Sequence, residues 1–161
     1  MMNSERLAVT TPSDREIAMT RVFNAPRHLV FEAWTKPELL RRWLGVHEGW
    51  VMVVCEIDLR VGGNYRYLWR APDGSEMGMR GEYREIVVPE KLVATEAFDQ
   101  SWYEGSAVST LKLVEQAGKT TCTISVIYDS KAIRDKVLQS PAEEGVAVGF
   151  DNLAQLLETR T

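Results

Sequence analysis

The feature that most constrains the fold is a series of strand-like segments joined by very short turns between residues 51 and 128. Pro72-Asp73-Gly74 and Ala117-Gly118-Lys119 are typical of tight turns. Strands joined by such short turns must pair antiparallel, because a parallel pair needs a long crossover connection. The expected strands cover residues 51–58, 65–70, 77–88, 92–98, 106–115 and 120–128.

Helical patterns flank these strands on both sides. Residues 16–24 read as a first strand, and apolar positions at helical spacing follow it from Leu29. Pro37 divides that pattern into two short helices. Near the C-terminus, a long helix carries one apolar stripe formed by Val146, Phe150, Leu153 and Leu157. The sequence therefore predicts an α+β fold, in which a sheet of about seven antiparallel strands is covered by the C-terminal helix and two short helices follow strand one.

The length of 161 residues is suited to one domain. Residues 1–13 are polar and are expected to form a loose N-terminal tail, and residues 14–160 a single domain. Cys55 and Cys122 lie far apart inside apolar segments, where they are expected to be buried free thiols.

Charge and hydropathy exclude several classes of protein. The net charge is −4 and the basic residues are scattered, which disfavours a nucleic-acid partner. No apolar run approaches the roughly 20 residues of a membrane span, and the N-terminus does not resemble a secretory signal. We therefore expect a cytoplasmic protein without a membrane span.

An aromatic strand raises the question of a ligand cavity. Tyr65, Tyr67 and Trp69 alternate with other residues and so share one face of their strand. On the next strand, the same period places Met77, Met79 and Tyr83 on that face. Aromatic residues with polar groups, clustered beside flexible methionines, suit an irregular cavity. A packed aromatic core explains the pattern equally well.

Glu96 is the most informative ionisable residue. It shares a strand face with Leu92 and Phe98, so its carboxylate points into the apolar interior, where desolvation raises a pKa. Such a group could transfer protons, or it could simply bond to a tyrosine or reach solvent at the strand end. In the following loop, Trp102 and Tyr103 could gate a cavity or fold back as a small cluster.

Other chemical signals are weak. His28 and His47 are isolated and fall short of the three or four ligands that a metal site needs. The sequence contains no nucleophile elbow and no glycine-rich phosphate loop. We expect no metal and no cofactor.

Three segments resemble one family. They are "NAPRHLVFEAWTKPELLRRWLG" (24–45), "DLRVGGNYRYLWRAPDGSEMGMRGEYREIVVPEKLV" (58–93) and "EEGVAVGFDNLAQLLE" (143–158). They are similar to the family of the C-terminal domain of the heat-shock-protein-90 ATPase activator, within the START-like, Bet v-like superfamily that includes polyketide cyclases. The similarity runs from about residue 14 to residue 159.

The resemblance implies a helix-grip fold, in which a curved antiparallel sheet wraps around the C-terminal helix and leaves an elongated cavity. Small hydrophobic molecules bind there in many relatives. Two departures concern the cavity. Relatives often have a second Trp where this chain has Leu44, and many carry a Trp where it has Val146. Both changes remove bulk, so the identity of the ligand does not carry over.

The leading hypothesis is a protein that binds a hydrophobic or aromatic small molecule between the sheet and the last helix. A cyclase-type or isomerase-type enzyme using Glu96 or a tyrosine is the alternative. A chaperone partner ranks last, because the activator also uses an N-terminal domain that is not part of this sequence. Homodimer formation stays open. The expected ligand-binding residues are Trp43, Tyr65, Tyr67, Trp69, Met77, Met79, Tyr83, Glu96, Phe98, Trp102, Val146, Phe150 and Leu153.

Overall fold

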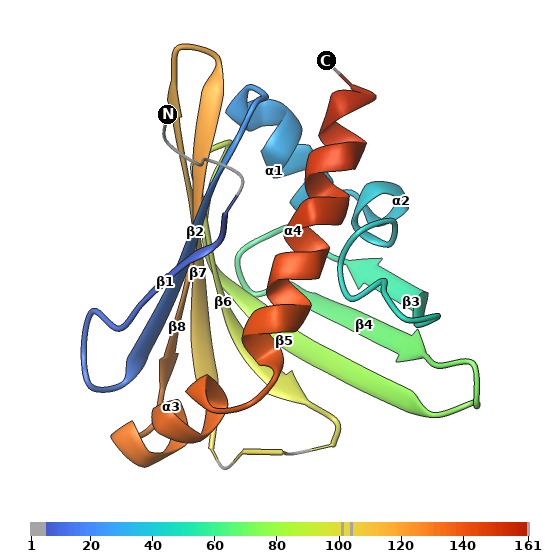
Figure 1. Cartoon of the computed structure of the whole chain (residues 1–161), viewed down its shortest axis with the longest axis vertical. Coiled ribbons are helices and arrows are strands. Elements are labelled where there is room, and N and C mark those ends of the chain that lie inside the picture. Colours follow the sequence, from blue (N-terminus) through green and yellow to red (C-terminus); the bar gives the residue numbers. More distant parts are fainter. Residues whose placement is uncertain (1–5, 101, 104, 161) are drawn as a thin grey trace.

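A computed structural model describes residues 6–100, 102–103 and 105–160. One antiparallel sheet curves around the long helix α4, which lies across its inner face (Figure 1). The strand order is β1-β2-β8-β7-β6-β5-β4-β3. The strands are β1 (Ala8–Thr10), β2 (Glu16–Phe23), β3 (Val51–Ile57), β4 (Asn64–Arg70), β5 (Glu76–Val87), β6 (Lys91–Phe98), β7 (Ala107–Gln116) and β8 (Lys119–Tyr128). The helices are α1 (Arg27–Thr35), α2 (Pro37–Leu40), α3 (Lys131–Leu138) and α4 (Ala142–Glu158). The predicted α+β helix-grip arrangement is thereby confirmed.

The N-terminal segment differs from the expected loose tail. Ala8–Thr10 forms strand β1 and pairs with β2, with Val9 opposite Met19. The apolar side chains of Leu7 and Val9 pack against the interior, which explains why this part of the segment is ordered. The extra strand makes the sheet eight-stranded instead of about seven-stranded. Residues 1–5 of the expected tail lie outside the described part.

The break at Pro37 is present as the sequence predicts. Helix α1 ends at Thr35, and Pro37 is the first residue of α2, where its missing N–H is not needed. The segment then brings Trp43 into the core, where its indole N–H donates to the carbonyl oxygen of Ala33 at 3.0 Å. This bond ties the segment after α2 to α1.

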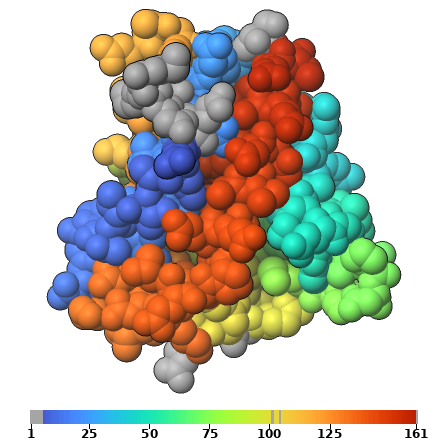
Figure 2. All heavy atoms as spheres, in the orientation of Figure 1, coloured from blue at the N-terminus to red at the C-terminus, as the bar shows by residue number. Residues whose placement is uncertain are grey.

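Helix α4 is packed tightly at its C-terminal half and loosely at its N-terminal half. Phe150, Leu153 and Leu157 are buried, with Leu153 at 0% exposure, whereas Val146 is only half-buried. In Figure 2, α4 occupies the middle of one face, between the N-terminal strands and the α2–β3 segment. No helix in the described ranges is long and apolar enough to cross a membrane.

The buried side chains form two clusters. The main cluster lies under the C-terminal half of α4 and includes Trp43, Phe150 and Leu153. The second cluster consists of Ile17, Met19, Tyr103, Ala107, Tyr128 and Val137. Val146 contacts both clusters but stays half-buried. The side chain at the start of α4 is therefore more accessible than those at its end.

The tight packing of α4 can be tested by truncating one side chain. We expect Leu153→Ala to lower the free energy of unfolding by about 2–5 kcal/mol, because it removes a fully buried side chain and leaves a cavity. Urea denaturation measures the change. Gln155→Ala, at an exposed position of the same helix, is the control and should change stability by less than about 0.5 kcal/mol. Equal effects of the two substitutions would contradict the packing described here.

Candidate ligand-binding site

The aromatic side chains of β4 face the interior, as the period-two pattern predicts. Tyr65, Tyr67 and Trp69 are 5–7% exposed, and their rings contact one another at centroid distances of 4.7 and 5.9 Å. The indole N–H of Trp69 donates to the carbonyl oxygen of Leu44 at 2.8 Å. These rings belong to the main cluster, together with Tyr83. This part of the predicted wall is a packed core.

The two methionines of β5 extend this row outwards. Met77 pairs with Trp69 across the sheet but is 41% exposed, and Met79 pairs with Tyr67 and is half-buried. Met79 also pairs with Phe98 on β6. The row therefore runs from the core to the open end of these strands.

Glu96 lies on β6 between strands that present very small side chains. On β7 it pairs with Ala107, which in turn pairs with Tyr128 on β8. On β5, the register with β6 sets Gly81 beside Glu96. Gly81 also pairs with Tyr65 of β4, whose hydroxyl donates to the carbonyl oxygen of Thr95 at 2.9 Å. A Cβ atom at Gly81 would overlap that oxygen and the ring of Tyr65. Tyrosines from β4 and β8 thus approach the carboxylate across residues that have almost no side chain.

The carboxylate of Glu96 has little polar compensation. The hydroxyl of Tyr103 donates to its Oε2 atom at 3.4 Å, and among the described residues this is its one side-chain hydrogen bond. Burial raises the pKa of Glu96 to about 7, and the bond from Tyr103 acts weakly in the opposite direction. Burial and the nearby Glu96 charge also raise the pKa values of Tyr65, Tyr103 and Tyr128. Four ionisable groups therefore meet in one part of the interior.

The loop after β6 packs back onto this group. Trp102 contacts Phe98 and Tyr103, with ring centroids 5.9 and 5.1 Å apart, and Tyr103 contacts Tyr128 at 5.4 Å. A pocket of about 150 Å³ lies beside this loop. It is lined by Arg80, Ala97, Phe98, Trp102, Tyr103 and Gly105. The sequence left open whether Trp102 and Tyr103 gate a cavity or fold back as a small cluster, and the structure shows the cluster. Tyr103 both lines this pocket and donates a hydrogen bond to Glu96.

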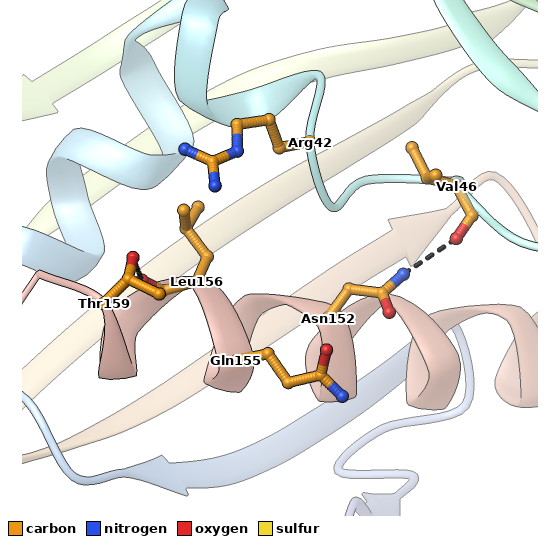
Figure 3. Close-up of a pocket in the computed structure, with 6 residues that line it drawn as sticks. All are labelled: Arg42, Val46, Asn152, Gln155, Leu156 and Thr159. Carbon is orange, nitrogen blue, oxygen red and sulfur yellow. Dashed lines mark hydrogen bonds between the residues drawn. The ribbon is translucent and has the colours of Figure 1, made fainter.

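A second pocket, of about 320 Å³, opens between the segment after α2 and the C-terminal half of α4 (Figure 3). It is lined by Arg42, Val46, Asn152, Gln155, Leu156 and Thr159, none of which the sequence pattern singled out. The side-chain amide of Asn152 donates to the carbonyl oxygen of Val46 at 2.8 Å. Arg42 reaches toward the C-terminal turns of α4, whose partial negative charge attracts a cation and repels an anionic ligand.

The curved antiparallel sheet around a long C-terminal helix is the helix-grip fold of START-like proteins. The family model described as "Activator of Hsp90 ATPase homolog 1-like protein" matches residues 24–158, and the chain belongs to this family.

Solved structures agree with this assignment. A Rhodobacter sphaeroides protein has a TM-score of 0.89 at 27% identity, over 95% of this chain and 98% of that one. Protein CV1439 from Chromobacterium violaceum has a TM-score of 0.76 at 29% identity, over 91% and 99% of the two chains. An AHSA1-like protein from Aeromonas hydrophila shares the fold at 18% identity and a TM-score of 0.68, over 90% and 93%. The comparison with curated proteins gave no match.

The raised pKa of Glu96 predicts a specific dependence of stability on pH. The folded protein holds the proton up to about pH 7, while the unfolded chain releases it near the ordinary value of 4.5. The contribution of Glu96 to the free energy of unfolding is therefore greatest below pH 4.5, and it is lost as the pH rises through 7. Relative to Glu96→Gln, which cannot ionise, the wild type should lose about 3 kcal/mol between these limits.

Urea denaturation of both proteins at pH 5 and pH 8 measures this difference. Glu143→Gln, at an exposed position in the first turn of α4, is the matched control and should follow the wild type at both pH values. If the gap between wild type and Glu96→Gln does not change with pH, the carboxylate is not desolvated as described.

Proposed function

We propose that the protein binds a small, largely apolar molecule between the sheet and the first turns of α4, with Glu96 at the polar end of the site. The observation that carries this proposal is the incomplete packing between the two core clusters. Ile124, Val126 and Val146 pack against those clusters and yet remain only half-buried. Interiors are normally close-packed, so a region of loose contact that holds a carboxylate suits a ligand better than it suits a structural core.

The start of α4 supports the same location. A methyl group placed on Gly145 would meet no atom within 4 Å, whereas one on Gly149 would contact Trp43. The middle of the helix therefore contacts the segment after α2, whereas its first turn has open space beside Gly145. The open space beside the first turn of α4 can therefore take up a ligand while the rest of the helix stays packed on the sheet.

The predicted lining residues divide into three groups under this proposal. Glu96, Phe98, Trp102 and Val146 contact the ligand, and Met79 and Phe150 border it. The remaining members support the site from the packed core or lie at its outer rim; they are Trp43, Tyr65, Tyr67, Trp69, Met77, Tyr83 and Leu153.

Filling the proposed space tests the function. Val146→Trp introduces the tryptophan that many members of the resembling family carry at this position. We therefore expect the fold to tolerate the substitution, while the indole ring occupies the proposed site. We expect the affinity for an uncharged hydrophobic fluorescent probe such as N-phenyl-1-naphthylamine, and for a panel of neutral aromatic compounds, to fall at least tenfold, measured by fluorescence titration and native mass spectrometry.

Val146→Ala is the matched control, because it enlarges the same space and should preserve or strengthen binding. Thermal unfolding verifies that both variants are folded. The proposal fails if no compound of the panel binds the wild type, or if the two variants change affinity in the same direction and to the same extent.

A proton-transfer enzyme is the second candidate, and the contact between Tyr103 and Glu96 favours it. A carboxylate with a pKa of about 7 can accept a proton from a carbon next to a carbonyl group. Once Glu96 is protonated it no longer needs the bond from Tyr103, and the freed Tyr103 hydroxyl can donate to the resulting enolate oxygen. β-Tetralone in deuterated water provides a test. Proton magnetic resonance should show faster deuterium incorporation with the wild type than with Glu96→Gln. Equal rates for both proteins would remove this candidate.

A further inference from the structure

Building on the proposed binding function, we propose that the polar group of the ligand is an organic ammonium ion, seated between the carboxylate of Glu96 and the surrounding tyrosines. The inference concerns the chemical class of the ligand, which neither the fold nor the family defines. It follows from the tyrosines that surround Glu96 and from the lack of a cationic side chain beside it among the described residues.

The described residues place no cation against Glu96. Its ionisable neighbours are all phenols: Tyr65 from β4, Tyr103 from the loop after β6 and Tyr128 from β8. The strands on either side of β6 contribute Gly81 and Ala107. The second cluster and its border add only apolar side chains from β2 and α4, which are Ile17, Met19 and Val146.

The nearby arginines are already engaged. Arg134 of α3 is buried, but it donates to the backbone oxygen of Ser13 at 2.8 Å and to the carboxylate of Asp135. Arg66 and Arg80 both bind Asp99. An ionised Glu96 therefore lacks a counter-ion inside the protein, and a cationic ligand would supply it.

The tyrosines add a second attraction for a cation. Aromatic ring faces carry partial negative charge and attract ammonium groups, most strongly where water is excluded. Tyr103 and Tyr128 meet edge-to-face at 87°, so the two rings present surfaces in different directions within one small region. The hydroxyl of Tyr65 already donates to Thr95, which leaves its oxygen as an acceptor.

Room for such a group lies on the α4 side of Glu96, where Ile124, Val126 and Val146 are only half-buried. On the other side, the ring of Tyr65 fills the space over Gly81 and forms a wall. A trimethylammonium group has a rounded, apolar surface around its charge, so it suits a space walled by rings and aliphatic side chains. An anionic group would instead face the charge of Glu96 at close range.

An isosteric pair of probes tests the inference. Benzyltrimethylammonium and neopentylbenzene have nearly the same shape and differ in one atom, a positively charged nitrogen in place of a neutral carbon. We expect the ammonium compound to bind the wild type at least tenfold more tightly at pH 8, by isothermal titration calorimetry or native mass spectrometry. Its affinity should fall about tenfold from pH 8 to pH 6, because a carboxyl with a pKa of about 7 goes from mostly ionised to mostly protonated.

Variants assign the effect to Glu96. Glu96→Gln should remove both the preference for the ammonium compound and its pH dependence, while the affinity for neopentylbenzene changes little. Glu143→Gln, exposed on α4, should behave like the wild type and excludes a general effect of net charge.

The possible failures are distinguishable. If neopentylbenzene or phenylacetate binds as tightly as the ammonium compound, the ammonium inference is wrong and the binding function stands. The same holds if the preference survives in Glu96→Gln. If neither these probes nor the hydrophobic panel binds, the proposed function itself is wrong.

Discussion

The contact between Trp43, Phe23 and Phe150 is the constraint on which the architecture depends. Phe150 lies 5.6 Å from Phe23 of β2 and 6.2 Å from Trp43, measured between ring centroids, so the helix is held to the sheet and to the segment after α2 at one point. The ion pair between Arg21 of β2 and Asp151 of α4, at 2.7 Å, reinforces this part of the helix. Because the anchor lies at the middle of α4, the turns before it can remain loosely packed.

Much of the fold follows from local patterns in the sequence. Pro37 separates α1 from α2, and the stripe of Phe150, Leu153 and Leu157 defines the buried face of α4. The inward orientation of Tyr65 follows from the period of two along a strand. These features are predictable because each depends on residues that are near one another in the chain.

Features that depend on pairing between distant strands were not predictable. The sequence identifies Glu96 as inward-facing, but only the register places Gly81 and Ala107 at its level and Tyr128 beyond them. Strand β1 escaped prediction because three residues give too short an alternation. The pocket beside Arg42 is formed by side chains from two distant segments and carries no sequence signal at all.

The absence of a side chain at Gly81 allows a contact between strands that are not neighbours. The ring of Tyr65 occupies the area above this residue, and its hydroxyl reaches a backbone oxygen on the strand beyond. One tyrosine thereby spans an entire neighbouring strand and links β4 directly to β6. The Tyr65 side chain thus links β4 to β6 next to Glu96. The position of Glu96 therefore depends on β4, even though β4 and β6 are not adjacent strands.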